Sequence, residues 1–391
     1  MKRILYVYHA SNIGGGTYCL LNILKAVDRN KIEPIVMLKK YGSLVDEIKK
    51  LNISVEYFPE MSQVPYNKSF FERDVLSRYI GLACSQTKFK NKIAQLKVDA
   101  VYLNTIVLAP YLRACKEIGL KTIIHIREHW PLNEHKLQLR SLQNTISAYA
   151  DEIVAINSYS ASMIPDRKVT IVYDWIDFSE RNQCMSFDDI FKEDASNLKI
   201  YLYAGGDQSI KGFYEVINAF SNYINDSNSR LLILGVGQFK KTKGFKGYIK
   251  KILYTLGFDS KRRKAYELIA KDSRIVTIPG TYKINHILQQ TYCNLSYFTI
   301  PHANLTLAEC IVLGTMSIAA KNEEALEYSN NGELALLYES NNFGGFIDAI
   351  KSLDENYSLY KQALNNNSII IEKFDKTRNI NALSSVYSKL F

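Results

Sequence analysis

A glycine-rich segment in the second half of the chain carries one lysine in a position suited to binding an anion. Gly205 and Gly206 end a strand-like run, and Lys211 follows just before a helical pattern that begins at Phe213. Backbone N–H groups at such a turn and helix start can hold a phosphate, and the lysine adds positive charge. The alternative interpretation is a solvated surface lysine.

A second segment places a carboxylate inside an apolar helix. The run Asn304-Leu305-Thr306-Leu307-Ala308-Glu309-Cys310 continues into IVLGTMSIAA. Burying a carboxylate is costly unless it has a partner, and the two hydroxyls of a ribose would suit Glu309. The alternative is a glutamate exposed at the rim that interacts favourably with the helix dipole.

A third segment lies at the N-terminus, where Gly14, Gly15 and Gly16 separate a strand-like run from a helical one. Consecutive glycines allow a ligand to approach the backbone closely. The spacing differs from G-x-G-x-x-G, and no acidic residue follows a second strand about 20 residues later, so a nicotinamide dinucleotide is not indicated. A plain strand-to-helix turn is the alternative.

Short apolar runs that alternate with longer amphipathic ones are typical of parallel α/β sheets. Helices are expected over 44–51, 73–96 and 108–118. The expected strands are 2–8, 34–38, 55–58, 100–104, 122–126, 152–156, 168–173, 199–206, 230–237, 274–280, 294–298 and 315–320.

The alternation of short apolar runs with amphipathic runs stops after Tyr173 and starts again at Lys199. This interruption predicts two domains. We expect an N-terminal Rossmann-like domain over 1–178, a polar linker over 179–198, a second Rossmann-like domain over 199–365 and a terminal helix over 366–391. A chain of 391 residues agrees with two cores of ordinary size.

Composition limits the class of protein. The chain is 47% hydrophobic and 23% charged, as in a soluble globular protein. Its first apolar run is too short for a signal peptide, and its six cysteines lack the spacing of a disulfide framework or zinc site. We therefore expect a cytoplasmic protein. The abundance of Lys, Asn, Ile and Tyr suggests an AT-rich bacterial genome.

Taken in order, these segments resemble the family 4 glycosyltransferases, a large retaining family with the GT-B fold. The resemblance covers most of the chain. It includes the glycines at 14–16, HIREHW at 125–130, ADEIVAINSYSA at 150–161, IVYDWID at 171–177, the Lys211 loop, LLILGVG, IVTIPGTYKI and the Glu309 helix with Gly314.

The resemblance implies two Rossmann-like domains facing across a cleft, with the C-terminal helix packing back toward the N-terminal domain. It implies that Lys211 neutralises the donor diphosphate, that Glu309 binds the ribose and that His125 contacts the sugar. Further donor-binding residues would be Gly15, Gly16, Gly205, Gly206, Gly280, Thr281, Tyr282, His302, Asn304, Leu305 and Thr306. Arg127, Glu128 and His129 would lie on the acceptor side. An inward-facing His125 with a satisfied hydrogen bond is the alternative for that residue.

The family implies a hexosyltransferase that uses a nucleotide-diphosphate sugar, retains the anomeric configuration and serves surface polysaccharide assembly. The acceptor would be a glycan or a lipid-linked glycan. Catalysis would be electrostatic, through stabilisation of the departing phosphate oxygen. No metal cofactor is expected, because no Asp-x-Asp pair stands beside the diphosphate-binding segments.

Two positions depart from the family pattern. An Arg five residues before the loop lysine and a Glu eight residues before the helix glutamate are usual, but Gly206 and Pro301 occupy these positions. The missing Arg removes one charge-assisted contact unless another cation compensates. A transferase-like scaffold that binds a partner or a sugar without catalysis therefore stays open. A GT-B epimerase or phosphorylase is less well supported, because the required carboxylates, cofactor lysine and chain length are missing.

A cluster of positive charge lies between Phe239 and Lys264. This segment holds ten basic residues and one acid, and it accounts for most of the net charge of +10. Aromatic and aliphatic residues are interleaved with the lysines, which suits an anionic membrane surface as well as a solvated loop. Nucleic acid is a weaker alternative.

Overall fold

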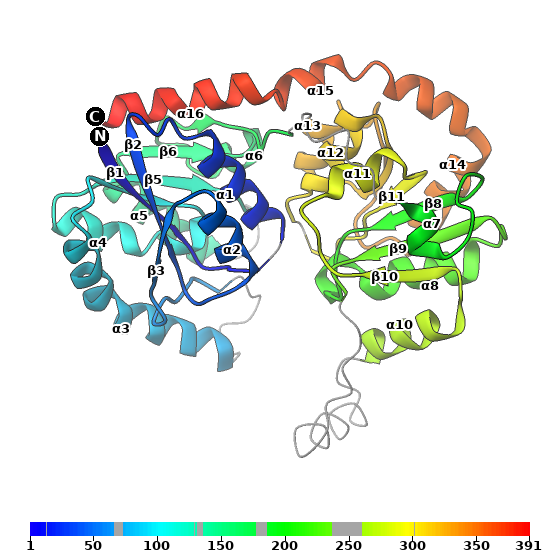
Figure 1. The fold of residues 1–391 in the computed structure, drawn as a ribbon, viewed down its shortest axis with the longest axis horizontal. Helices are drawn as coiled ribbons and strands as arrows, with labels where there is room; N and C mark the ends of the chain where they lie inside the picture. The colour runs from blue at the N-terminus through cyan, green and yellow to red at the C-terminus, as the bar shows by residue number, and fades with distance from the viewer. Residues whose placement is uncertain are drawn as a thin grey trace. The chain divides into compact units, whose positions relative to one another are not determined.

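The computed structural model describes residues 1–12, 14–65, 73–128, 130, 136–176, 186–236, 260–300 and 302–391. The chain divides into two compact units (Figure 1). Unit 1 comprises Met1–Trp175 together with Phe374–Phe391, and unit 2 comprises Ile176–Lys373. The chain therefore passes from unit 1 to unit 2 after Trp175 and returns at Phe374.

Unit 1 is built on a seven-stranded parallel sheet with the strand order β3-β2-β1-β4-β5-β6-β7. Its strands are β1 (Lys2–Tyr8), β2 (Ile32–Leu38), β3 (Ser54–Tyr57), β4 (Ala100–Leu103), β5 (Lys121–Ile126), β6 (Glu152–Ala155) and β7 (Thr170–Ile171). Its helices are α1 (Gly15–Ala26), α2 (Ser43–Lys50), α3 (Arg73–Leu96), the 3-10 turn η1 (Ile106–Leu108), α4 (Tyr111–Glu117), α5 (Lys136–Tyr149), α6 (Ser158–Ser162) and α16 (Lys376–Leu390).

Helices cover both faces of this sheet, so its central strands are apolar on both sides. Along β1, Leu5 and Val7 belong to one buried cluster, whereas Ile4 and Tyr6 belong to the other. The second cluster also contains Tyr387 of α16, whose hydroxyl lies 2.9 Å from that of Tyr6. The prediction that the C-terminal helix packs on the N-terminal domain is therefore confirmed.

Unit 2 contains a six-stranded parallel sheet with the order β10-β9-β8-β11-β12-β13. Its strands are β8 (Lys199–Tyr203), β9 (Ser229–Leu234), β10 (Ile275–Ile278), β11 (Cys293–Leu295), β12 (Met316–Ala320) and β13 (Leu336–Tyr338). Its helices are α7 (Phe187–Phe191), the turn η3 (Ser209–Lys211), α8 (Phe213–Tyr223), α10 (Ser260–Lys271), α11 (Ile284–Gln289), α12 (Leu305–Leu313), α13 (Glu323–Tyr328), α14 (Phe343–Leu364) and α15 (Ser368–Lys373).

The expected strands are present, although several are shorter than predicted, and further differences lie at the sheet edges. The run 168–173 forms only the two-residue edge strand β7, and the short edge strand β13 was not predicted. A terminal helix was expected over 366–391, but α15 ends at Lys373 and α16 starts at Lys376. Asp375 caps α16, because its side chain accepts a hydrogen bond from the N–H of Arg378 at 2.7 Å.

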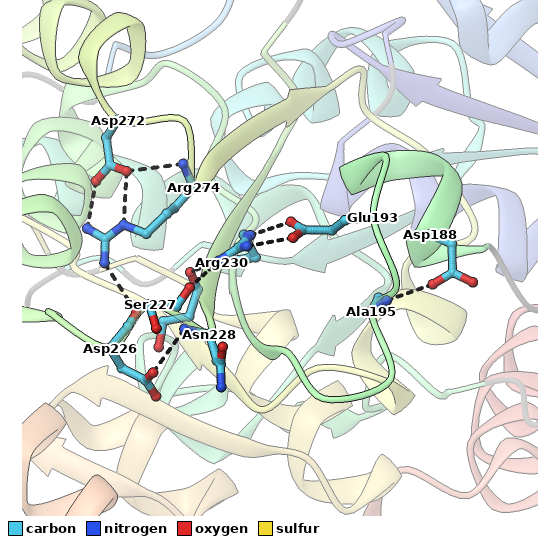
Figure 2. Close-up of polar contacts among 10 residues, drawn as sticks. Asp188, Glu193, Ala195, Asp226, Ser227, Asn228, Arg230, Asp272 and Arg274 are labelled. Atoms are coloured by element: carbon cyan, nitrogen blue, oxygen red, sulfur yellow. Dashed lines mark hydrogen bonds and ion pairs between the residues drawn. The ribbon is translucent and has the colours of Figure 1, made fainter.

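Two ion pairs lie at the amino ends of β9 and β10 (Figure 2). This is the end of the sheet opposite to the carboxyl ends of its strands. Arg230, at the start of β9, donates to both carboxylate oxygens of Glu193 at 2.5 and 2.7 Å. Arg274, just before β10, pairs with Asp272 at 2.8 Å. These four charges are occupied in holding the sheet and its loops together.

Within the described part of the chain, no helix is both long and apolar enough to cross a membrane.

Candidate functional site

The strand order of unit 2 creates a switch point between β8 and β11. The chain runs from β8 outward to β9 and β10, then returns to add β11 on the other side of β8. Ligands of open α/β sheets bind beyond the carboxyl ends of the strands at such a point. The predicted residues Gly205, Gly206 and Lys211 follow β8, and 302–306 follow β11. The fold therefore brings together two segments that lie far apart in the sequence.

Hydrogen bonds fix the loop between β8 and α8 at both ends. The N–H of Gly206 donates to Leu234 O at 3.0 Å, and the hydroxyl of Tyr203 donates to Lys211 O at 3.1 Å. The N–H of Thr299, from the segment after β11, donates to Ile210 O at 3.0 Å. The last bond ties the lysine loop directly to the segment that leads into α12.

Lys211 is half-buried at the end of η3. The structure therefore does not support the alternative interpretation of Lys211 as a solvated surface residue. Burial lowers the pKa of its ammonium group. No ion pair of Lys211 is present among the described residues, whereas the neighbouring acid Asp207 is bonded to Arg262 and Tyr266. A desolvated cation without a counter-ion gains from binding an anion.

Gly206 stands where an Arg was expected, and its backbone explains why a side chain is disfavoured there. Its φ of +62° lies in the left-handed region that glycine adopts without strain. The adjacent residue Asp207 forms an ion pair with Arg262 of α10. A guanidinium group therefore lies beside this loop although residue 206 carries none. Pro301, the other departure, lies outside the described residues.

The start of α12 offers further groups for an anion. Asn304 caps the helix, with its side chain accepting from the N–H of Leu307 at 3.2 Å. Its own N–H donates to the buried Glu324 of α13 at 2.5 Å. Leu305 and Thr306 are half-buried first residues, whose N–H groups have no acceptor within the helix. Such a start attracts negative charge.

Glu309 is 2% exposed in the middle of α12, which excludes the interpretation as a rim-exposed glutamate. His302 is half-buried, with its ring 5.4 Å from that of Phe298. Gly280, Thr281 and Tyr282 follow the edge strand β10, away from the switch point, but they lead into α11, which packs against α12. No sequence pattern pointed to the role of Glu324, because this role depends on α13 lying next to the start of α12.

Unit 1 has its own switch point between β1 and β4. Gly15 and Gly16 begin α1 directly after β1. A Cβ atom on Gly16 would overlap with the hydroxyl of Tyr8, whereas one on Gly15 would meet nothing within 4 Å. The glycine at 16 therefore permits α1 to start against the end of β1.

His125 is an inward-facing strand residue, 1% exposed at the end of β5. Its Nδ1 lies 2.7 Å from the hydroxyl of Tyr102 and 3.3 Å from Nη1 of Arg127. Burial, together with the charge of Arg127, holds the pKa of the imidazole well below its usual range. The ring is therefore neutral at physiological pH, with one nitrogen bonded inside the fold.

Arg127 and Glu128 are engaged with other groups of unit 1. Arg127 is 8% exposed and pairs with Asp174 at 2.5 Å. Burial opposes its charge, but the Asp174 carboxylate more than offsets this and raises its pKa. Glu128 accepts hydrogen bonds from the Thr105 hydroxyl and from Ile106 N at 2.9 Å. Sequence reasoning missed these partners, and His129 lies outside the described residues.

Solved structures resemble the whole chain. The HepE protein of Anabaena, crystallised with UDP and glucose, matches with a TM-score of 0.74 at 17% identity over 100% of both chains. Sucrose-phosphate synthase from Thermosynechococcus elongatus matches with a TM-score of 0.70 at 12% identity, over 100% of this chain and 99% of that one. A glycosyltransferase from Rickettsia africae gives 0.67 at 16% identity, over 100% and 98%.

No protein-family model and no curated protein matches the sequence. The structural matches cover the full length of the chain and of the solved proteins, and they share the GT-B architecture of two parallel sheets with flanking helices. The predicted fold class is therefore confirmed.

Proposed function

We propose that this chain, which has the GT-B fold, is a glycosyltransferase that moves a sugar from a nucleoside diphosphate to an acceptor. One observation carries the proposal. Lys211, half-buried and without an ion pair among the described residues, stands on a loop bonded through Thr299 to the segment before α12. This arrangement of a buried cation and a helix start suits a diphosphate.

Several of the predicted donor residues then have roles. Lys211 and the N–H groups of Leu305 and Thr306 bind the diphosphate, and Glu309 accepts hydrogen bonds from the ribose. The segment 280–282 lies along the nucleobase. HepE, one of the structural relatives, was crystallised with UDP, so a UDP-sugar is the first donor to test. Arg262, held beside the loop by Asp207, supplies the cation that residue 206 lacks.

The chemistry is electrostatic. As the bond between the sugar and the diphosphate breaks, negative charge develops on the leaving oxygen, and Lys211 and the N–H groups stabilise it. The acceptor hydroxyl attacks from the same face as the leaving group and gives its proton to the departing phosphate oxygen, so the transfer retains configuration. We propose that no metal is needed, and a chelator added to the transfer assay should leave the rate unchanged.

The acceptor is proposed to be a glycan or a lipid-linked glycan of a surface polysaccharide, bound on the side of His125 and Arg127. The basic segment 239–264 is proposed to contact an anionic membrane. Lys261 and Arg262 pair with Glu215 and Asp207, whereas Arg263 makes only an exposed pair with Glu267 of the same helix, so the test should use Arg263→Glu with Lys264→Glu. Release of this variant from anionic vesicles supports the proposal, and unchanged sedimentation contradicts it.

The function is tested by a donor screen that measures release of nucleoside diphosphate. Lys211→Ala and Glu309→Ala should abolish release. Lys321→Ala and Glu339→Ala are matched controls, because these two residues form an exposed ion pair 2.9 Å apart in unit 2. Release that continues unchanged in Lys211→Ala would sink the proposal.

A second candidate is a scaffold that binds a nucleotide or a sugar without transferring it. The replacement of the expected Arg and Glu by Gly206 and Pro301 favours it. Calorimetry combined with the release assay separates the two functions. A scaffold would bind a nucleotide sugar but release no nucleoside diphosphate with any acceptor.

A further inference from the structure

A groove runs along the outer surface of unit 1 between the helices α3, α4 and α5 (Figure 1). These helices cover the same face of the sheet, because each contributes residues to the buried cluster that contains Leu5 and Val7. The short helix α4 packs against both α3 and α5. The two longer helices therefore form the walls of this α3–α5 groove, and α4 lies between them. None of the predicted site residues of unit 1 that the structure describes lines the groove.

The groove has the size of a ligand-binding cleft. Its volume is about 570 Å³, which falls within the roughly 300–1,000 Å³ that is usual for such clefts. At one end, Nε2 of Gln138 in α5 donates to the Tyr79 hydroxyl of α3 at 3.1 Å. At the other end, Lys90 of α3 pairs with Glu117 of α4 at 2.9 Å. Tyr79 and Lys90 are about 16 Å apart along α3, so the groove can hold an extended ligand.

Each wall of the groove is one face of its helix. The α3 residues that line it recur at short, regular intervals, at positions 79, 82, 83, 86, 87 and 90. Those of α5 follow a similar spacing, at positions 138, 141, 142, 145 and 149. Residues three or four positions apart lie on the same side of a helix. The two walls therefore present continuous stripes of side chains to the same space.

The lining combines an apolar floor with polar walls that carry little net charge. Leu82, Ala114 and Leu142 are at most 5% exposed and form the floor. Glu117 accepts hydrogen bonds from two cations of the lining, Lys90 at 2.9 Å and Arg113 at 3.1 Å. The uncharged polar side chains of the walls include Tyr79, Tyr149, Gln86, Gln138, Ser141 and Thr145. A ligand in the groove therefore meets mainly amides, hydroxyls and aromatic rings.

The amide of Gln138 keeps one group for a ligand. Its Nε2 is bonded to Tyr79, whereas its Oε1 is buried and has no hydrogen-bond partner among the described residues. A buried acceptor without a partner is costly. A ligand hydroxyl that donates to Oε1 removes this cost.

A carbohydrate matches this lining better than other classes of ligand. Its hydroxyls both donate and accept, as amide and hydroxyl side chains require, and the apolar faces of its rings can pack on aromatic and aliphatic side chains. A phosphorylated ligand would need a cation that is not already paired, but Lys90 and Arg113 share Glu117. An acyl chain would leave the amides and hydroxyls of the walls without partners.

We propose that the α3–α5 groove binds a segment of a neutral oligosaccharide, with Gln138 as a hydrogen-bonding residue. This inference rests on the proposed transferase function and deepens it. The groove holds part of a glycan acceptor or product at a distance from the reacting hydroxyl. Two contacts on one glycan chain give a higher affinity than either contact alone, so long acceptors are preferred to short ones.

The first test measures binding and needs no turnover. Calorimetry uses uncharged hexasaccharides of glucose, mannose and N-acetylglucosamine. Ala83→Trp places a large side chain in the groove from an exposed position of α3, and Gln138→Leu removes the amide. Each variant should raise the Kd of the bound hexasaccharide at least tenfold, which corresponds to about 1.4 kcal/mol.

Asn144 provides the matched controls for this test. It is an exposed residue of α5 that does not line the groove, so Asn144→Trp and Asn144→Leu should leave the Kd unchanged. Thermal melts check that every variant is folded. A wild type that binds none of the hexasaccharides, or an unchanged Kd in Ala83→Trp, would overturn the proposal. Binding of hexagalacturonate alone would also overturn it, because the ligand would then be acidic.

The second test uses acceptor length to separate this inference from the proposed function. Ala83→Trp should raise the KM for a long acceptor by about tenfold or more, while the KM for the donor and for the shortest accepted acceptor stay unchanged. An unchanged KM for the long acceptor, with normal turnover, overturns the role of the groove and leaves the transferase function intact. A wild type that releases no nucleoside diphosphate contradicts the proposed function, and the hexasaccharide titration then still decides whether the groove binds a glycan.

Discussion

Nη2 of Arg127 donates to both carboxylate oxygens of Asp174, each at 2.5 Å, and joins the end of β5 to the last residues before the chain leaves unit 1. The Arg127 side chain is 6% exposed and the Asp174 side chain 13%. The pair therefore stabilises the segment after β7 against the centre of the sheet.

Breaking this pair should be strongly destabilising. Asp174→Ala leaves the guanidinium group buried without its counter-ion, at a cost of about 3–5 kcal/mol. Urea denaturation measures the change. Lys88→Ala is the control, because Lys88 and Glu60 form an exposed pair of unit 1 whose loss should change the stability far less. Equal effects of the two variants would contradict the structural role of Arg127.

The two glycines at the start of α1 should differ in their tolerance of a methyl group. Gly16→Ala should lose about 1–3 kcal/mol, because its Cβ would overlap with the Tyr8 hydroxyl. Gly15→Ala is the control and should be neutral or slightly stabilising, since its Cβ meets no described atom within 4 Å. Tyr8→Phe combined with Gly16→Ala should recover part of the loss. A double variant no more stable than Gly16→Ala would exclude the Tyr8 hydroxyl as the cause.

Lys211 should contribute to binding and not to stability. Burial lowers the pKa of the ammonium group, and no ion pair offsets it among the described residues, so Lys211→Ala should leave the melting temperature unchanged or raise it slightly. The Kd for UDP should rise at least tenfold, which corresponds to about 1.4 kcal/mol. Calorimetry with UDP and a parallel thermal melt check both expectations. A stability loss without a change in Kd would make Lys211 a structural residue.

Glu309 should distinguish a ribonucleotide from its 2′-deoxy analogue. If its carboxylate binds the ribose hydroxyls, the wild type should bind UDP more tightly than 2′-deoxy-UDP, by roughly 1.5–3 kcal/mol for a hydrogen bond to a charged group. Glu309→Gln should reduce this difference, whereas Glu339→Gln should preserve it. An undiminished preference in Glu309→Gln would remove Glu309 from the ribose site.

His9 should make the protein sensitive to acid. Burial, assisted by the charges of Arg78 and Lys39, lowers the pKa of its imidazole to about 4. Below about pH 6.5 the unfolded chain binds a proton that the folded protein excludes, so stability is full above pH 6.5 and falls toward pH 4. At about 1.4 kcal/mol per pKa unit, the loss attributable to His9 approaches about 3 kcal/mol near pH 4. Urea midpoints between pH 7.5 and 4.5 should fall less steeply in His9→Gln than in the wild type, and parallel curves would contradict this.

Local sequence determined the elements and several features of the candidate residues. The apolar run of β1 and the amphipathic run of α3 were predicted with the bounds that the structure has. The apolar residues around Glu309 left a buried and a rim-exposed carboxylate open, and the structure shows the buried one. These features depend on the alternation of apolar and polar residues, which specifies the type of an element and the face that it buries.

Tertiary structure alone decided which of these residues meet. The alternation of side chains along a strand does not specify its neighbour in the sheet. The bond between Thr299 and Ile210, the bond between Asn304 and Glu324, and the position of Asn104 beside His125 depend on strand order and helix packing. Asn104 follows an ordinary strand in the sequence. The fold buries its amide beside His125, with no hydrogen-bond partner for the amide among the described residues.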